Sequence, residues 1–108
     1  MSRPARRCSP VPEEVRQTAD LLERRWQLSI IYAALSGALR FNEFAEAISG
    51  ISPRMLSERL RDLEAAGLVE RTVIPSSPPT VEYRLTARGR RLGPIIEAMG
   101  AYAREPVG

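Results

Sequence analysis

The stretch from Gly50 to Gly67 constrains the fold of this chain more than any other segment. Gly50 can adopt a positive φ and end a preceding helix, and Gly67 can end the helix that follows. Ser52 followed by Pro53 is a typical helix start, because serine caps the first turn and proline has no N–H that would go unpaired there. Three leucines then recur at helical spacing and predict one buried stripe: Leu56, Leu60 and Leu63.

The opposite side of this helix carries polar side chains, at Arg54, Ser57, Glu58 and Arg61. A short helix, a tight turn and a second helix with an exposed arginine-bearing face are typical of a rod presented to the DNA major groove. We expect base-edge or phosphate contacts from Arg54 and Ser57, which lie near the leading end of the helix. Glu58 and Arg61 fit equally well a solvated helix face, on which Glu58 pairs with a neighbouring arginine.

The same stretch lies within a longer pattern of elements. Hydrophobic periodicity predicts four helices before a hairpin, at 13–23, 25–35, 40–48 and 52–66. Alternating and β-branched residues then predict two strands around a proline-rich loop, at 68–74 and 80–85. Thr86 can cap a last helix that continues to about Ala103, and Pro94 should kink that helix or mark its true beginning. We expect an N-terminal arm at 1–12 and a single domain at 13–108.

Composition restricts the classes of function that such a domain can have. Of the 108 residues 44% are hydrophobic, and the net charge of +3 is compatible with nucleic acid as a partner. All 16 basic residues are arginine, which is typical of a GC-rich genome, so only the positions of the arginines carry functional meaning. The chain has no histidine, no glycine-rich phosphate loop and no paired carboxylates in a cleft motif, so we expect no enzyme activity.

The single cysteine and the lack of long apolar runs bear on compartment and cofactors. One cysteine, Cys8, excludes an intramolecular disulfide and favours a reducing compartment. Without histidine a zinc site would depend on carboxylates, so we expect no metal and no cofactor. No apolar run approaches the ~20 residues of a membrane helix. The basic segment 1–7 is not followed by an apolar one, so we expect no signal peptide and a cytoplasmic location.

Four segments together resemble the HxlR-type regulators, bacterial winged-helix transcription factors, over nearly the whole chain from Cys8 to Tyr102. They are Arg40-Phe41-Asn42-Glu43, Gly50-Ile51-Ser52-Pro53-Arg54-Met55-Leu56, Leu63-Glu64-Ala65-Ala66-Gly67-Leu68-Val69-Glu70-Arg71 and Val81-Glu82-Tyr83-Arg84-Leu85-Thr86-Ala87-Arg88-Gly89. The resemblance implies an α+β winged helix-turn-helix fold: a helical core, a two-stranded β-hairpin wing and a C-terminal dimerisation helix.

The resemblance also implies a homodimer on an inverted-repeat operator in double-stranded DNA, with dimer contacts from the first and last helices. Some relatives use the cysteine at the position of Cys8 as a redox or electrophile sensor, so an oxidant or small-molecule inducer is expected as a partner. An inert cysteine remains the alternative. One departure concerns the junction before the second helix, where the family usually has Gly-Lys-Trp and this chain has Arg24-Arg25-Trp26. Arg24 replaces a flexible glycine, so we expect the junction to differ locally.

Further contacts are expected outside the second helix of the motif. Arg40 and Asn42 lie at the start of the third helix, where they can reach phosphates, and Ser52 can donate to phosphate as well as cap. The wing comprises the loop 76–80 and Arg84, and an arginine is favoured in a narrow minor groove. An ordinary surface arginine on a hairpin is the alternative for Arg84.

The last helix carries a broad apolar stripe that predicts a dimer interface: Leu92, Ile95, Ile96, Met99 and Tyr102. Packing of this stripe on the core of its own subunit is the alternative. Trp26, the only tryptophan, is expected to be buried in the core.

Taken together, these residues predict a sequence-specific DNA-binding transcriptional regulator that acts as a homodimer. The alternative is a winged-helix module that binds other proteins and no DNA, because a fold does not determine a function. Such a module has no need to keep Arg54, Ser57 and Arg61 facing outward, so the exposed face of the fourth helix distinguishes the two hypotheses.

Overall fold

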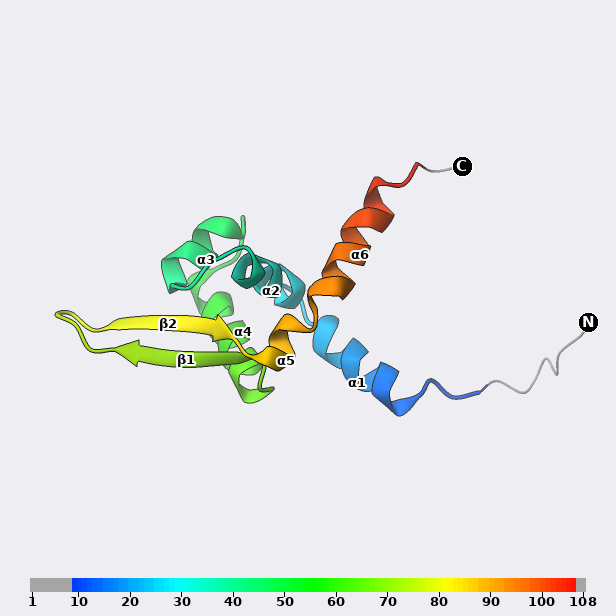
Figure 1. Cartoon of the computed structure of the whole chain (residues 1–108), viewed down its shortest axis with the longest axis horizontal. Coiled ribbons are helices and arrows are strands. Elements are labelled where there is room, and N and C mark those ends of the chain that lie inside the picture. Colours follow the sequence, from blue (N-terminus) through cyan, green and yellow to red (C-terminus); the bar gives the residue numbers. More distant parts are fainter. Residues whose placement is uncertain (1–8, 107–108) are drawn as a thin grey trace, which may run out of the picture.

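The computed structural model describes residues 9–106, in which helices precede and follow a β-hairpin (Figure 1). The elements are α1 (Glu13–Leu22), α2 (Gln27–Leu35), α3 (Phe41–Ala47), α4 (Pro53–Ala65), β1 (Val69–Ile74), β2 (Thr80–Leu85), α5 (Ala87–Arg90) and α6 (Gly93–Arg104). Helices α2, α3 and α4 lie together at the base of the hairpin, while α1 and α6 project away from it (Figure 1). The predicted winged helix-turn-helix architecture is confirmed, and most element boundaries lie within two residues of those expected.

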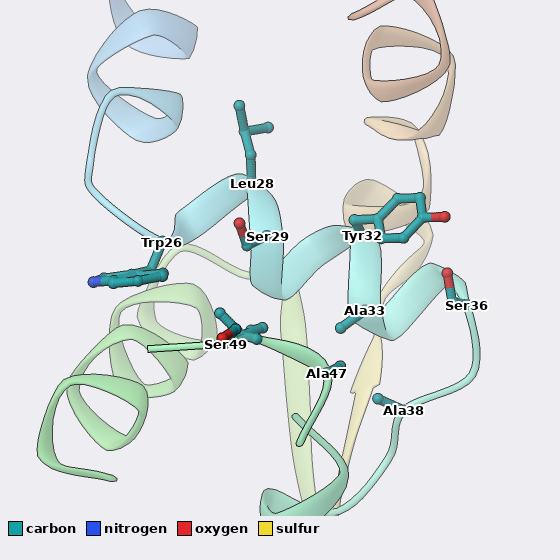
Figure 2. Close-up of a pocket in the computed structure, with 10 residues that line it drawn as sticks. Trp26, Leu28, Ser29, Tyr32, Ala33, Ser36, Ala38, Ala47 and Ser49 are labelled. Carbon is teal, nitrogen blue, oxygen red and sulfur yellow. The ribbon is translucent and has the colours of Figure 1, made fainter. Parts of the chain in front are cut away.

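Helix α2 begins two residues later than its periodicity predicts, because Trp26 has a left-handed backbone with a φ of 78°. The guanidinium of Arg25 lies 4.6 Å from the centre of the Trp26 ring. Trp26 is only partly buried, and its ring faces a pocket of about 520 Å³ between α2 and the end of α3 (Figure 2). Tyr32 and Ser49 border the same pocket. The expectation that Trp26 is a core residue is therefore only partly correct.

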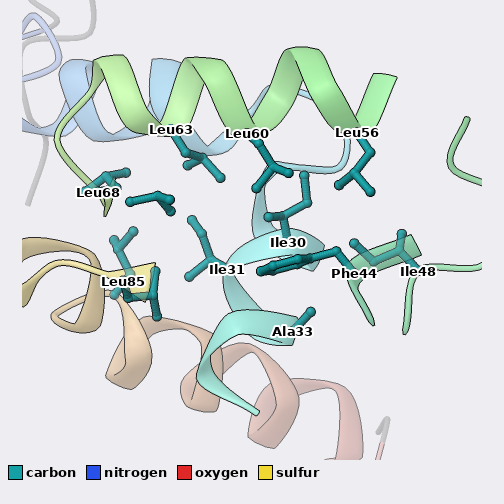
Figure 3. Packing of buried hydrophobic residues seen from close by; sticks show 12 residues of the cluster. Ile30, Ile31, Ala33, Phe44, Ile48, Leu56, Leu60, Leu63, Leu68 and Leu85 are labelled. Atoms are coloured by element: carbon teal, nitrogen blue, oxygen red, sulfur yellow. The ribbon is translucent and has the colours of Figure 1, made fainter. Parts of the chain in front are cut away.

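The core forms where α4 lies across α2 and α3 (Figure 3). The predicted leucine stripe of α4 points inward, and each of its three side chains is almost fully buried. It packs with Ile30 and Ile31 of α2 and with Phe44 of α3 (Figure 3). Since burial of one such side chain stabilises a fold by about 1.5–3 kcal/mol, this layer determines the orientation of α4.

Two polar residues are buried that periodicity does not identify. Gln27 is 1% exposed, and its Oε1 has no hydrogen-bond partner among residues 9–106. Glu82 lies in β2 at a position that alternation predicts to face solvent, yet it is buried while Tyr83 is only half-buried. Unlike a strand of an isolated hairpin, β2 has a neighbour along each edge, with β1 on one and the loop between α2 and α3 on the other. On the edge that faces away from β1, the N–H of Tyr83 donates to the carbonyl of Leu39 at 2.7 Å.

The end of the chain does not form the single helix that is expected after Thr86. It forms α5 and α6, and α6 begins at Gly93 with Pro94 in its first turn. This agrees with the prediction that Pro94 marks a beginning. Thr86 does cap α5, because its Oγ accepts from the N–H of Gly89 at 3.1 Å, and it also donates to the carbonyl of Gly67 at 2.7 Å.

The break between α5 and α6 changes the role of Leu92. This residue is expected in the exposed stripe of the last helix, but it is 8% exposed and belongs to the core of its own subunit. Ile96 is partly buried against the same core, whereas the rest of the stripe is exposed: Ile95, Met99 and Tyr102. Among the described residues, no helix is long and apolar enough to cross a membrane.

Candidate nucleic-acid interface

The turn between α3 and α4 determines how α4 is presented. Gly50 has a φ of 90°, a conformation that side chains other than glycine rarely adopt. Ser52 is the N-cap of α4, and its Oγ accepts a hydrogen bond from the N–H of Met55 at 3.0 Å. Pro53 occupies the first turn, as predicted. With one face of α4 held by the leucine stripe, the opposite face is left at the surface.

That surface face carries four of the predicted contact residues in two pairs. Arg54 has a side chain that is 91% exposed, and its Nε lies 3.5 Å from Oε2 of Glu58. One turn further along, Nη2 of Arg61 donates to Oγ of Ser57 at 3.3 Å. Pairs of this kind at the surface contribute little to stability, so exchanging them for contacts to a ligand costs little. The alternative interpretation of Glu58, in which it pairs with an arginine, describes its position in the free protein.

A third arginine of α4, Arg59, is turned to the other side and stabilises the fold. Its side chain is 17% exposed; Nη1 lies 2.7 Å from Oδ2 of Asp62, and Nε donates to the carbonyl of Arg25 at 3.0 Å. Arg24 reaches the same Asp62 oxygen at 2.8 Å. Arg24, which stands where the family usually has glycine, therefore links the α1–α2 junction to α4.

At the start of α3, Arg40 and Asn42 are exposed, and Glu43 holds the backbone. Oε1 of Glu43 accepts hydrogen bonds from the N–H groups of Leu39, at 2.7 Å, and Arg40, at 3.0 Å. These two backbone donors, with a smaller contribution from the charge of Arg40, hold the pKa of Glu43 below its ordinary value of 4.5. The side chains of Arg40 and Asn42 make no hydrogen bond or ion pair with the rest of residues 9–106.

Arg84, which we expect to act with the loop of the wing, does not lie at the tip of the hairpin. Arg84 is paired in register with Glu70, at the inner end of the hairpin rather than at its tip. Its Nη2 lies 2.8 Å from Oε1 of the buried Glu82. The tip is ordered by Ser76, whose Oγ donates to the carbonyl of Pro78 at 2.6 Å. A contact from Arg84 to DNA would therefore compete with an existing ion pair.

Between α4 and the hairpin lies a polar pocket of about 430 Å³ that sequence reasoning misses. It is lined by Ser57, Leu60, Arg61, Glu64, Arg71 and Tyr83. Arg71 and Tyr83 face each other across the two strands, so they lie on one side of the hairpin. Arg71 and Tyr83 can be identified as neighbours only from the register of the two strands, and the periodicity within each strand does not reveal that register.

The apolar surface lies away from these residues, on α1 and α6. Among the described residues, none of α1 is fully buried: Leu21 and Leu22 are partly buried against the core, and Val15 is 51% exposed. On α6, Ile95, Met99 and Tyr102 border a shallow apolar groove. Cys8, the predicted sensor, lies outside the described residues. Within residues 9–106, no group of three or more His, Cys, Asp or Glu side chains is arranged to hold a metal ion.

Comparison with known proteins gives a consistent picture. The family described as HxlR-like helix-turn-helix matches residues 21–107. The chain is 42% identical to YvaP of Bacillus subtilis, an HTH-type transcriptional regulator, over 82% of each chain. It is 43% identical to the HTH-type transcriptional regulator YodB of the same organism, over 77% of this chain and 74% of YodB.

Solved structures extend the likeness to the fold. The reduced form of YodB has a TM-score of 0.79 at 37% identity, and the match covers 92% of this chain and all of that one. The redox regulator HypR in its oxidised form has a TM-score of 0.78 at 40% identity, over 87% of this chain and 99% of HypR.

Proposed function

This chain belongs to the HxlR-like helix-turn-helix family of transcriptional regulators, and on that premise we propose that it binds an inverted-repeat operator in double-stranded DNA as a homodimer. The observation that carries the proposal is the outward face of α4. Arg54 and Ser57 lie at its leading end, and the capped turn before it holds the helix in a defined orientation. Arginine and hydroxyl side chains at that position suit guanine edges and phosphates.

Two exposed helices support the homodimer. A ten-residue helix is marginal in water by itself, and within the described part of the chain α1 has no fully buried residue: only Leu21 and Leu22, at its C-terminal end, are partly buried against the core. Tyr102 of α6 is 80% exposed and Met99 is 48% exposed. Both helices project from the same end of the molecule, opposite the hairpin (Figure 1). A second copy that covers them would leave the α4 faces of both subunits free for DNA.

An electrophoretic mobility shift with the DNA that flanks the gene of this protein tests the proposal. The wild type should shift this fragment in preference to random DNA, and the affinity should fall steeply as salt rises. Arg54→Ala should weaken operator binding by about 1–3 kcal/mol and reduce the preference over random DNA, if this side chain reads a base edge. Arg104→Ala, at the far end of α6, is the matched control.

Two outcomes would contradict this assignment. A folded Arg54→Ala variant with wild-type affinity would remove Arg54 from the interface. A wild type that binds neither the flanking DNA nor random DNA at low salt would favour the alternative, a winged-helix module that binds protein only.

We further propose that oxidants or electrophiles regulate this binding through Cys8. The support is the likeness to YodB and to HypR, which is described as a redox regulator, together with Arg6 and Arg7, which precede Cys8 in the sequence, since positive charge near a thiol favours the reactive thiolate. Diamide should lower the operator affinity of the wild type and leave Cys8→Ser unchanged. If both proteins respond alike, or neither responds, Cys8 is not the sensor.

A further inference from the structure

The polar pocket between α4 and the hairpin carries an excess of positive charge. Arg61 comes from α4 and Arg71 from β1, and neither has a carboxylate oxygen within 4.0 Å among residues 9–106. Glu64 is the single carboxylate among the lining residues, so the lining has a formal charge of +1. By contrast, Arg59 and Arg84 are both paired with acids that belong to the fold.

The remaining lining residues match a tetrahedral anion better than an apolar ligand. Ser57 and Tyr83 contribute hydroxyl groups, and Leu60 is the only apolar residue of the lining. Ser57 already accepts a hydrogen bond from Arg61, so these two lining residues of α4 are joined to each other. Two guanidinium groups offer paired N–H donors with the geometry that phosphate oxygens require.

The position of the pocket distinguishes a DNA phosphate from a free one. Ser57 and Arg61 belong both to the lining and to the outward face of α4 that we assign to the major groove. A helix in the major groove has a sugar–phosphate backbone along each of its sides. With α4 in the groove and the hairpin beside it, one backbone would run along the mouth of the pocket that the two elements form, which Arg71 lines.

We propose that this pocket binds a phosphodiester of the DNA backbone, with Arg61 and Arg71 as its two cationic ligands. The inference rests on the proposed function and deepens it by assigning Arg71 and Arg61 to backbone positioning. Bases are read by Arg54, whereas the pocket sets the depth and register of α4 on any DNA sequence.

The test compares the salt dependence of binding to the operator and to random DNA for wild type, Arg71→Gln and Arg61→Gln. Each substitution should weaken both kinds of DNA by a similar factor and reduce the slope of log affinity against log salt. The expected reduction is about 0.9 for each phosphate that is no longer neutralised, hence ~1.8 for a dimer. Arg104→Gln is the matched control and should leave the slope unchanged. Arg54→Ala should instead weaken the operator more than random DNA.

Glu64→Gln should change the DNA affinity in the opposite direction, which a purely structural role of the pocket would not produce. Removal of a negative charge from a phosphate pocket should strengthen binding to both DNAs by about twofold. Thermal unfolding with and without millimolar inorganic phosphate, in the absence of DNA, tests the other source of the ligand. We expect equal shifts for wild type and Arg71→Gln.

The failures of the two proposals are distinct. If the wild type binds no DNA, the proposed function falls and this inference falls with it. If the wild type binds the operator while Arg71→Gln has wild-type affinity and slope, only the phosphodiester site is overturned. It is likewise overturned if inorganic phosphate stabilises the wild type and not Arg71→Gln, because the pocket would then be a site for a free anion.

Discussion

Gly89 shows how closely the elements of this protein approach one another. A Cβ atom at this position would lie 2.3 Å from the carbonyl oxygen of Leu68 and 2.9 Å from Cδ2 of Leu85. The backbone of α5 therefore rests directly on the end of α4 and the start of the hairpin. Thr86 makes the same connection through its hydroxyl group and its N–H, which donates to the carbonyl of Leu68 at 2.9 Å. The hairpin is thus held from both of its ends.

We expect Gly89→Ala to lower the free energy of unfolding by about 1–3 kcal/mol, because an added methyl group has no space beside a backbone carbonyl. Gly100→Ala is the control, since the added Cβ would meet only the flexible end of Arg104, at 3.3 Å. Urea denaturation of the two variants checks this. Equal stabilities for Gly89→Ala and the wild type would show that α5 can move away from Leu68 without cost.

Also at the residue scale, arginines that look alike in the sequence have different roles. Arg54 and Arg61 lie at the surface with weak partners, whereas Arg59 is bound to Asp62 and to the backbone of Arg25. A count of arginines on α4 would rank them equally. Arg54 and Arg61 can bind a ligand without breaking a contact between two helices. Arg59 cannot, because it joins α4 to the backbone of Arg25.

At the scale of single elements, each helix of the helix-turn-helix has its own N-terminal acceptor. Ser52 caps α4 by a hydroxyl group, and such a cap typically contributes about 1 kcal/mol. Glu43 serves α3 by accepting two backbone N–H bonds from Leu39 and Arg40. Because Leu39 also accepts from the N–H of Tyr83, the carboxylate holds the segment that connects α3 to β2.

The charge of Glu43 should make the stability of this protein depend on pH. Its pKa in the folded state lies below the ordinary value of 4.5, so its contribution is present above the pKa of the unfolded state. It is lost as the pH falls through the folded-state pKa. We expect Glu43→Gln to be less stable than the wild type at neutral pH, with a difference that shrinks once the pH falls below 4.5.

Denaturant titrations of both proteins across this range measure the difference directly. Glu46→Gln, at an exposed glutamate beyond the first turn of the same helix, is the control. A difference between Glu43→Gln and the wild type that is constant from neutral to acidic pH would mean that the shape of the side chain, and not its charge, stabilises the start of α3.

At the scale of the whole molecule, the two ends have opposite character. The end formed by α4 and the hairpin carries Arg54, Arg61 and Arg71, and the end formed by α1 and α6 carries the exposed apolar side chains of Val15, Ile95, Met99 and Tyr102. In the proposed homodimer, the two α4 helices should lie about 34 Å apart, or a multiple of this, so that both reach major grooves on one side of the DNA.

Met99→Glu tests the proposed dimer. The substitution should weaken it by about 100-fold or more, since two unpaired carboxylates in an apolar contact cost about 3 kcal/mol or more. Ala101→Glu, exposed on another side of the same helix, should have little effect. Sedimentation velocity over a range of concentrations measures the change. A monomeric wild type at micromolar concentration, on DNA as well as free, would refute the homodimer.

The sequence by itself determined the elements of this protein and their order, because their signals are local. The leucine stripe of α4, the cap at Ser52, the positive φ of Gly50 and the start of α6 at Pro94 each depend on residues a few positions apart. The winged helix-turn-helix architecture, read from those elements and from the resemblance to its family, agreed with the structure for the same reason.

Only the tertiary structure decided which residues meet across elements. It buried Glu82 beside Arg84, moved Leu92 from the exposed stripe into the core, and placed Arg71 and Arg61 in the lining of one pocket. It also gave Trp26 a left-handed backbone that no tryptophan favours by itself. These outcomes depend on strand register and on the packing of segments that lie far apart in the chain. A hydrophobic period measured within one element holds no information about either.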